Sequence, residues 1–431
     1  MWKNKSWGTN RIKDKYNNVS TRSNTAADLY EVQPYYQRFN QKNNMTRQRF
    51  WNPPAMKLQK QLNKNLKEAI TKNLVGYSLR DWAFFIGASG NMTVNNFSIN
   101  SPNQKGNSWQ PLSKLSKPSS SISPDENYGK LETEPSVATS MVRKMSMFFG
   151  ADDVGISLLD RRWVYSHWFD EETKKHYPIK FSDEPGYEEF QEPVQLEDKT
   201  QVIPAKMKYA IVLLHEMDEL GMATAPTLTQ AATTRTVYSK ISFATVMLAE
   251  FIRGLGYNAI PSANDTALSI PLAIDAGLGE LGRNAKLINP RYGPRCRISK
   301  VITDLPLTPG KPRLWGVTEF CNSCLKCAKN CPAGAIPIGE RSFEATGIAN
   351  NPGVLQWQLD HMKCYGYWSQ VGTNCGICIR TCPFNKSKHW SHNIVRTIIR
   401  MKSHNIDSVV SRMDDSFGYG RFKNPNNFWS A

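Results

Sequence analysis

Apolar positions follow the period of a strand and then that of a helix soon after residue 205. The run Lys208–His215 is almost wholly apolar and of strand length, so it predicts a buried strand. The segment Thr233–Arg253 carries apolar residues at helical spacing. Its expected N-cap is Thr233 or Thr234, and Gly254 is the expected first residue beyond its C-terminus.

Three shorter elements continue this alternation. We expect a strand over Asn258–Ile260, a helix over Pro271–Ala276 and a strand over Arg297–Thr303. Strands that alternate with helices predict a mixed α/β (α+β) core over about 205–310.

The chain before this core has a weaker pattern. Residues 1 to about 75 are polar, basic and rich in Asn and Gln, with isolated aromatic residues. Such a segment makes a poor core of its own, and we expect it to wrap over another part of the protein. Within the first 150 residues, Met56–Thr71 and Glu134–Phe149 predict helices with one apolar face. The stretch Phe97–Asn127 is dense in Ser, Asn, Pro and Gly and predicts a long surface loop.

Composition excludes general disorder. The chain has 431 residues, of which 40% are hydrophobic and 11% aromatic, enough for two or three domains. Its formal charge of +17 is uneven, because Asp170–Asp198 holds ten acidic residues and three lysines. A basic excess is compatible with nucleic acid, with an anionic membrane face, or with solubility alone. No apolar run reaches the length of a membrane span.

The N-terminus shows no export signal. It has no apolar signal-peptide core, and the Arg161-Arg162 pair lies too far along the chain to belong to a twin-arginine leader. We expect either a cytoplasmic protein or a chain whose leader has been removed.

The cysteines carry the strongest chemical signal. Cys321-Asn-Ser-Cys324-Leu-Lys-Cys327-Ala-Lys-Asn-Cys331-Pro332 matches the bacterial ferredoxin run. The later run repeats this spacing, with ten residues in place of two after its first cysteine. In such runs the fourth cysteine ligates the other cluster. We therefore predict two [4Fe–4S] clusters, the first held by Cys321, Cys324, Cys327 and Cys382 and the second by Cys331, Cys364, Cys375 and Cys378.

Other uses of these cysteines are less favoured. Paired zinc sites need neither a third Cys at the next two-residue step nor a Cys-Pro ending. A disulfide framework is not expected in a chain this long. Cys296 is left over, and its default reading is a buried inert thiol.

Two further features admit more than one reading. Gly277-Leu-Gly279-Glu-Leu-Gly282 satisfies the dinucleotide fingerprint, but it follows a predicted helix where the fingerprint needs a strand. A glycine loop that approaches another large ligand suits the context better.

The ten-residue spacer Tyr365–Asn374 reads as an aromatic loop that walls off a site beside the second cluster, or as an exposed insertion. A two-cluster module alone could be an electron relay, whereas the attached α/β core favours a reaction site in this chain.

The order of motifs resembles the corrinoid-dependent reductive dehalogenases of organohalide-respiring bacteria over residues 130–431, and only loosely over the first 100. The motifs in question are Tyr238-Ser-Lys240, Gly254-Leu-Gly-Tyr-Asn-Ala-Ile-Pro261, Ser262-Ala-Asn264-Asp265, Ala276-Gly-Leu-Gly-Glu-Leu-Gly-Arg283, Arg295-Cys-Arg297-Ile298, and the two cluster runs with Trp368.

The resemblance implies a nitroreductase-like core that binds a base-off cobamide and is fed by two clusters in series. We expect the second cluster to lie next to the corrinoid, because its ligand run carries the loop with Trp368. The sequence has no Asp-x-His-x-x-Gly motif for a histidine ligand, which agrees with a base-off state. Five domains are expected. The first three are an N-terminal unit (1–130), a corrinoid-binding core (131–157 and 205–315) and an acidic insertion packed on the N-terminal unit (158–204). A ferredoxin-like double-cluster domain (316–385) and a C-terminal segment that returns to the core (386–431), with a helix over Asn393–Ser411, complete the chain.

Carried over by motif, Tyr238 would donate the proton, Arg297 would be its neighbour, and Asn264 a polar partner near the substrate. A phenol is a weak acid, and an adjacent guanidinium stabilises the phenolate as the proton leaves. Without the resemblance, these three would read as a core tyrosine, a surface arginine and a turn asparagine. The expected substrate-pocket aromatics are Trp368, Trp82, Trp51 and Phe39, and the expected corrinoid contacts are Gly277, Gly279, Glu280, Leu281, Gly282 and Arg283.

The implied function is reductive removal of chloride from small chlorinated aliphatics, either ethenes or methanes and ethanes. The expected partners are a small membrane anchor protein and a respiratory electron donor, with a homodimer possible and no nucleic acid. The expected location is the outer face of the cytoplasmic membrane after twin-arginine export. Two alternatives stay open: an epoxyqueuosine-reductase-like tRNA-modifying enzyme, which would use a carboxylate in place of the Tyr/Arg pair, and an electron-transfer subunit without a corrinoid.

Overall fold

The computed structural model describes residues 25–94, 109, 129–385 and 419–430. The predicted loop Phe97–Asn127 and the predicted helix Asn393–Ser411 lie outside the described residues. No helix in the described part is long and apolar enough to cross a bilayer.

A four-stranded antiparallel sheet forms the centre of the protein, in the order β1-β6-β10-β7. The strands are β1 (Asp153–Leu158), β6 (Tyr209–Glu216), β10 (Cys296–Thr303) and β7 (Ala259–Ser262). The three strands predicted in this region are confirmed within one or two residues, whereas β1 was not predicted.

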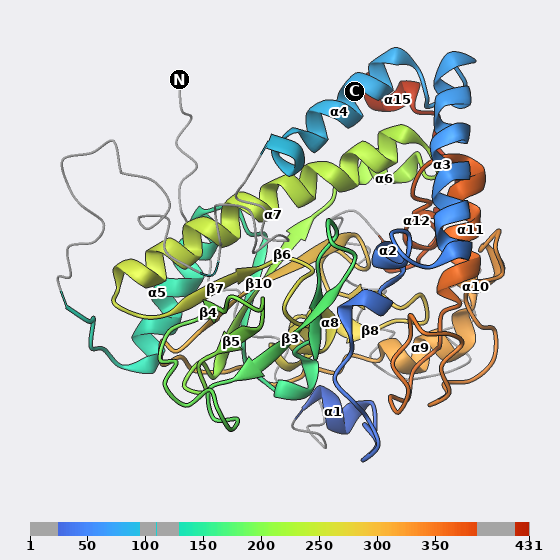
Figure 1. Cartoon of the computed structure of the whole chain (residues 1–431). Coiled ribbons are helices and arrows are strands. Elements are labelled where there is room, and N and C mark those ends of the chain that lie inside the picture. The colour runs from blue at the N-terminus through green and yellow to red at the C-terminus, as the bar shows by residue number, and fades with distance from the viewer. Residues whose placement is uncertain (1–24, 95–108, 110–128, 386–418, 431) are drawn as a thin grey trace, which may run out of the picture.

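Helices cover both faces of this sheet (Figure 1). On one face, α5 (Pro135–Phe148) and α7 (Leu228–Gly254) bury Val142 and Leu248 against Ile211 of β6. On the other face, α8 (Ser269–Asp275) buries Leu272 against the neighbouring residues of β6 and β10. The predicted mixed α/β core is therefore confirmed.

Helix α7 begins earlier than its pattern predicts. Thr227 is its N-cap, and the Thr227 hydroxyl accepts a hydrogen bond from the Gln230 amide. Thr233 and Thr234 lie inside the helix, so the predicted cap is wrong. The apolar pattern misses the first turn and a half because the helix is buried there against several elements, so it has no polar face. The helix ends at Gly254, and Gly256, not Gly254, takes the left-handed conformation that follows.

The acidic insertion forms a second sheet. Its strands are β2 (His167–Phe169), β3 (His176–Phe181), β5 (Gln201–Ile203) and β4 (Val194–Gln195), in that order. The N-terminal segment lies against this sheet, since Arg38 donates to the carbonyls of Val164, Tyr165 and Ile179, and the Gln41 side chain accepts from the Phe169 amide. The two segments thereby form one wall of the molecule.

Two long helices of the N-terminal unit frame the opposite end (Figure 1). Helix α3 (Pro53–Thr71) packs beside α11 (His361–Val371), and α4 (Leu79–Val94) lies along α7. The predicted helix Met56–Thr71 is confirmed in α3. The aromatic spacer, in contrast, is helical over most of its length, so its reading as a loop is wrong. Helix α11 begins before Cys364 with Asp360 as N-cap and ends at Gly372, which has a left-handed φ of 73°.

The remaining elements are short. They are α1 (Ala26–Leu29), η1 (Gln41–Asn43), α2 (Met45–Gln48), η3 (Arg161–Trp163), α6 (Glu219–Ala223), β8 (Glu280–Leu281), β9 (Leu287–Ile288), α9 (Val317–Cys324), α10 (Lys326–Lys329), α12 (Ile377–Arg380) and α15 (Asn426–Trp429). The glycine motif 277–282 leads into the β8–β9 hairpin, without the helix that dinucleotide binding requires.

Candidate active site and cluster-binding cysteines

The first four predicted ligands surround one hollow. Cys321 and Cys324 lie on α9, Leu325 turns the chain in a left-handed conformation, and Cys327 lies on α10. Cys382 comes from the far end of the module, and all four cysteines line the same space. The structure thus brings together the four residues that the ferredoxin spacing assigned to the first cluster.

The second set also converges. Cys331, Cys364 and Cys378 share one apolar cluster with Leu359, and Cys327 of the first set packs against the same cluster. Cys375 directly precedes Gly376, whose left-handed φ of 71° turns the chain into α12. Backbone amides donate to two of these sulfurs, from Ala335 to Cys331 at 3.4 Å and from Ile377 to Cys375 at 3.5 Å. Such hydrogen bonds stabilise cluster thiolates and tune their potential.

Paired zinc sites were the alternative use of these cysteines. A structural zinc site draws four ligands to about 2.0–2.3 Å from one ion. Among the described residues, no three His, Cys, Asp or Glu side chains converge closely enough to hold one metal ion. The preference for clusters over zinc therefore continues to rest on the spacing of the cysteines.

Glu280 and Arg283 attach the cysteine module to the core. The buried Glu280 carboxylate accepts from the amide of Trp315 at 2.6 Å. Arg283 donates to the carbonyl of Cys321 at 2.9 Å and to three carbonyls of the loop that follows Ile336, and it stacks on Trp357. Both side chains therefore form hydrogen bonds to backbone groups of the protein.

The predicted corrinoid contacts lie mostly within packed protein. A Cβ added at Gly277 would lie 2.7 Å from the Lys311 carbonyl oxygen, and one added at Gly279 would lie 2.5 Å from that of Ile288. Gly282 is equally close to the Ile288 side chain. These glycines allow segments of the chain to approach one another. Of the six predicted contacts, Leu281 is the one that lines the large cavity described next.

A cavity of about 470 Å³ lies between the core, the N-terminal unit and the cysteine module. This volume is within the usual range for small-molecule sites. The N-terminal unit contributes Tyr30, Phe39 and Arg47 to its wall, and the segment before α11 contributes Trp357 and Leu359. Leu359 and Ala285 line this cavity, and both belong to the apolar cluster that includes three cysteines of the second set. The second set of cysteines therefore lies next to the cavity.

Tyr238, Asn264 and Arg297 meet on this cavity wall. The Asn264 amide donates to the Tyr238 hydroxyl at 3.1 Å, and the Arg297 guanidinium lies 5.6 Å from the centre of the Tyr238 ring. Arg297 Nε is buried and has no hydrogen-bond partner within the described part of the chain. A buried donor without a protein partner suits a site that a ligand completes. The structure thus juxtaposes three residues from α7, the turn after β7, and β10.

The predicted pocket aromatics separate into two groups. Phe39 lines the cavity and packs near Tyr165. Trp368 packs with Tyr365 and Met45 in the seam between α11 and the N-terminal helices. Trp82 stacks on Phe85 of α4, and Trp51 donates to the Lys42 carbonyl. These three tryptophans do not line this cavity, and their role as substrate-pocket residues stays a prediction. Trp163 and Trp357 line it instead.

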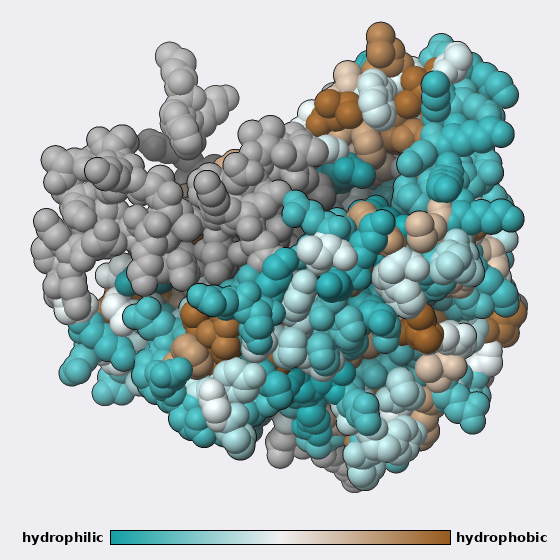
Figure 2. Space-filling view, in the orientation of Figure 1, coloured by the Kyte–Doolittle hydropathy of each residue, from teal (hydrophilic) through white to brown (hydrophobic). Residues whose placement is uncertain are grey.

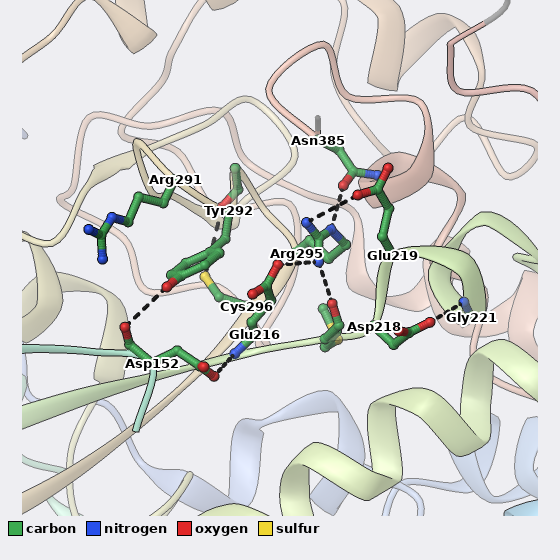
Figure 3. A network of polar contacts seen from close by, with 12 residues as sticks. Asp152, Glu216, Asp218, Glu219, Gly221, Arg291, Tyr292, Arg295, Cys296 and Asn385 are labelled. Carbon is green, nitrogen blue, oxygen red and sulfur yellow. Dashed lines mark hydrogen bonds and ion pairs between the residues drawn. The ribbon is translucent and has the colours of Figure 1, made fainter. Parts of the chain in front are cut away.

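Sequence reasoning missed a polar network behind the site, centred on Arg295 (Figure 3). The side chain of Arg295 is 2% exposed and donates to Asn385 Oδ1 and Glu216 Oε1, both at 2.8 Å, and to the Met217 carbonyl. Asn385 lies three residues after Cys382, a predicted cluster ligand, so this network connects the cysteine module to β6 and β10. Cys296, beside it, lines the cavity, and burial raises the pKa of its thiol to about 12. Cys296 is buried, as its default reading predicted, and its lack of reactivity stays a prediction.

Known proteins resemble this chain in sequence and in fold. Residues 56–307 match the family model of the reductive dehalogenase subunit, and residues 320–385 match the 4Fe-4S double cluster binding domain. The tetrachloroethene reductive dehalogenase of Sulfurospirillum multivorans is 39% identical over 309 residues, which cover 69% of this chain and 60% of that protein. The chain therefore spans less than two thirds of the length of this relative.

Two solved structures share the fold. One, described with a mechanism for B12-dependent dehalogenation, has a TM-score of 0.54 at 24% identity and covers 68% of this chain and 38% of that chain. The other, a catabolic reductive dehalogenase, has a TM-score of 0.63 at 20% identity and covers 93% of this chain and 48% of that chain.

Proposed function

Because this chain belongs to the reductive dehalogenase family, we propose that it removes chloride reductively from chlorinated ethenes. The observation that carries the proposal is the meeting of Tyr238, Asn264 and Arg297 in a cavity beside the second set of cysteines. The relative from Sulfurospirillum multivorans, a tetrachloroethene reductive dehalogenase, supports this substrate class.

The proposed cofactors are two [4Fe–4S] clusters and a corrinoid. Cys321, Cys324, Cys327 and Cys382 would hold the first cluster, and Cys331, Cys364, Cys375 and Cys378 the second. A corrinoid in the cavity would supply a cobalt centre that takes part in the two-electron reduction of the carbon–chlorine bond. The second cluster would be its immediate electron donor; Leu359, which lines the cavity and belongs to the apolar cluster of Cys331, Cys364 and Cys378, supports this order.

In the proposed reaction the chlorinated carbon accepts two electrons and one proton, and chloride leaves. Tyr238 would donate this proton from its hydroxyl. The Asn264 amide would then stabilise the phenolate through its hydrogen bond, and the positive charge of Arg297 would lower its free energy further. Phe39, Trp163 and Trp357 would exclude water and favour a small apolar substrate.

We also propose that no imidazole of the protein ligates the corrinoid. His361 is a histidine on the cavity wall, and burial, aided by Lys286, lowers its pKa to about 4. A neutral imidazole is a potential metal ligand, so His361→Ala tests the point. Under the proposal, the absorbance of the corrinoid-loaded protein stays unchanged in this variant; a shift in the cobalt bands would show ligation by His361.

The partner face is a further proposal. Exposed apolar residues follow the end of α3 and run along α4, with Leu79 75% and Val75 61% exposed. Figure 2 shows this brown surface next to the hydrophilic surface of α3, whose exposed lysines are Lys57, Lys60, Lys64, Lys67 and Lys72. We propose that this face meets the small membrane anchor protein at the outer side of the cytoplasmic membrane.

The test of the function compares two tyrosines of the same cavity. Tyr238→Phe removes the proposed donor, and Tyr36→Phe removes another cavity hydroxyl, which bonds to the Arg162 carbonyl at 3.3 Å. We expect Tyr238→Phe to lower the rate of chloride release by about 10²-fold or more, the usual contribution of a general acid. Tyr36→Phe should retain most of the activity. Full activity in Tyr238→Phe would overturn the assignment of the donor.

A further inference from the structure

A lysine is completely buried behind the proposed proton donor. Lys300 lies on β10, its exposed fraction is 0%, and it pairs in register with Ser262 at the end of β7. Its ammonium donates to the Ala263 carbonyl at 2.8 Å and to the Ser269 hydroxyl at 3.1 Å. Burying a cation costs several kcal/mol of stability even after relaxation, and lysine is rarely found fully buried. An explanation for its retention is therefore needed.

The lysine is bonded to the turn that presents Asn264. In this turn the Asp265 carboxylate accepts from the Ala263 amide at 2.7 Å, and the Ser262 hydroxyl donates to the Asp265 carbonyl at 2.6 Å. Thr266 takes a left-handed φ of 62°, and its carbonyl accepts from the Tyr165 amide. The Ala263 amide and the carbonyls of Ala263, Asp265 and Thr266 are thus held by hydrogen bonds on both sides of Asn264.

The Asn264 side chain, in contrast, is exposed towards the cavity. The amide reaches the Tyr238 hydroxyl at 3.1 Å, and the Asn264 carbonyl accepts from the Tyr165 hydroxyl at 3.3 Å. No packed neighbour fixes an exposed amide, so its position depends on the backbone of the turn. Lys300 is the one charged group that donates to this backbone from the sheet side, among the described residues.

Lys300 and Asp265 also interact electrostatically within this turn. Burial lowers the pKa of Lys300, and the charge of Asp265 opposes that effect. Burial raises the pKa of Asp265 to about 6, and the charge of Lys300 opposes it in turn. The ammonium and the carboxylate therefore favour each other's charged state from the two sides of the turn.

We propose that Lys300 is a positioning residue, which holds the turn Ser262–Thr266 so that the Asn264 amide stays on the Tyr238 hydroxyl. The inference rests on the proposed function in so far as Tyr238 is the donor. Under this proposal Lys300 contacts neither the substrate nor the cofactor and acts through Asn264 alone.

The kinetic test is a double-mutant cycle in the enzyme loaded with clusters and corrinoid. Lys300→Met keeps the length of the side chain and removes its donors, and Asn264→Ala removes the amide. Each single variant should lower kcat by about 10- to 100-fold with a smaller change in KM, because misplacing one group by about 1 Å costs up to about 10² in rate. The double variant should be no worse than Asn264→Ala. Independent, multiplicative losses would overturn the proposal. Lys208→Met, at an exposed site, is the matched control.

A second readout needs no turnover. With 3-fluorotyrosine at position 238 of the cluster-loaded protein, the fluorine resonance reports the hydrogen bond of the phenol. Lys300→Met should move this resonance in the same direction as Asn264→Ala. If Lys300→Met does not fold, Ser269→Ala, which removes one partner of the ammonium, should give a smaller shift in that direction. An unmoved resonance would overturn the proposal. If the resonance moves as expected but the wild-type chain releases no chloride, the positioning role holds and the proposed function fails.

Discussion

Replacing Arg295 with methionine should destabilise the protein strongly, because the substitution leaves three acceptors behind in a buried network. Arg295 is 2% exposed and donates to Asn385 Oδ1 and Glu216 Oε1 at 2.8 Å and to the Met217 carbonyl. A lost hydrogen bond to a charged group costs about 1.5–3 kcal/mol, and a buried neutral acceptor left alone about 1–3 kcal/mol. Glu216 is 22% exposed and regains water, and the Glu219 contact at 3.9 Å is largely exposed, so both add little.

The expected loss of unfolding free energy in Arg295→Met is about 3–4 kcal/mol, within the range for breaking a buried ionic network. Urea denaturation followed by circular dichroism measures it. Arg291→Met, at the exposed neighbour of the same loop, should change the stability by less than about 0.5 kcal/mol. A change below about 1 kcal/mol in Arg295→Met would show that the network does not join the module to the core.

Two further predictions concern the clusters and pH. The double variant Cys327→Ala/Cys382→Ala loses two ligands of one cluster and should retain about four iron atoms per chain. The double variant Cys327→Ala/Cys331→Ala loses one ligand of each cluster and should retain almost no iron. Equal iron contents in the two variants would contradict the assignment of ligands to clusters. Burial lowers the pKa of His215 to about 4, so its contribution to stability is complete above about pH 6.5 and is lost as the pH falls towards 4, by about 3 kcal/mol. His215→Gln should flatten this part of the stability curve measured in urea, and an unchanged slope would refute the reasoning.

Local signals were enough to predict which cysteines come together and most of the core. Ligand spacing encodes which thiols meet, and the structure brings Cys382 to Cys321 across 60 intervening residues as the ferredoxin pattern requires. The strand over Tyr209–Glu216 is an apolar run that no turn residue interrupts. Motif order, taken from a family, located Tyr238, Asn264 and Arg297, which composition alone would have assigned to core, turn and surface.

The remaining features depend on contacts between distant segments. Trp368 lies in a cluster-binding run, yet α11 turns it towards Met45 and away from the cavity, and no sequence period states which neighbour a helix face will meet. The start of α7 was missed because its first turns are buried on all sides. Glu280 and Arg283 looked like cofactor contacts, and only the fold shows that backbone groups of the cysteine module occupy them. The burial of Arg295 and Lys300 likewise has no local signal, because charged residues are normally exposed.

Chloride release from tetrachloroethene is the most direct test of the account. The chain is loaded with iron, sulfide and cobamide, reduced with a low-potential donor, and supplied with tetrachloroethene, trichloroethene, chloroform or 1,1,1-trichloroethane. We expect one chloride for every two electrons consumed, with chlorinated ethenes turned over fastest and the rate abolished when Tyr238 is replaced by phenylalanine. A fully loaded protein that releases no chloride from any of the four compounds would contradict the proposed function.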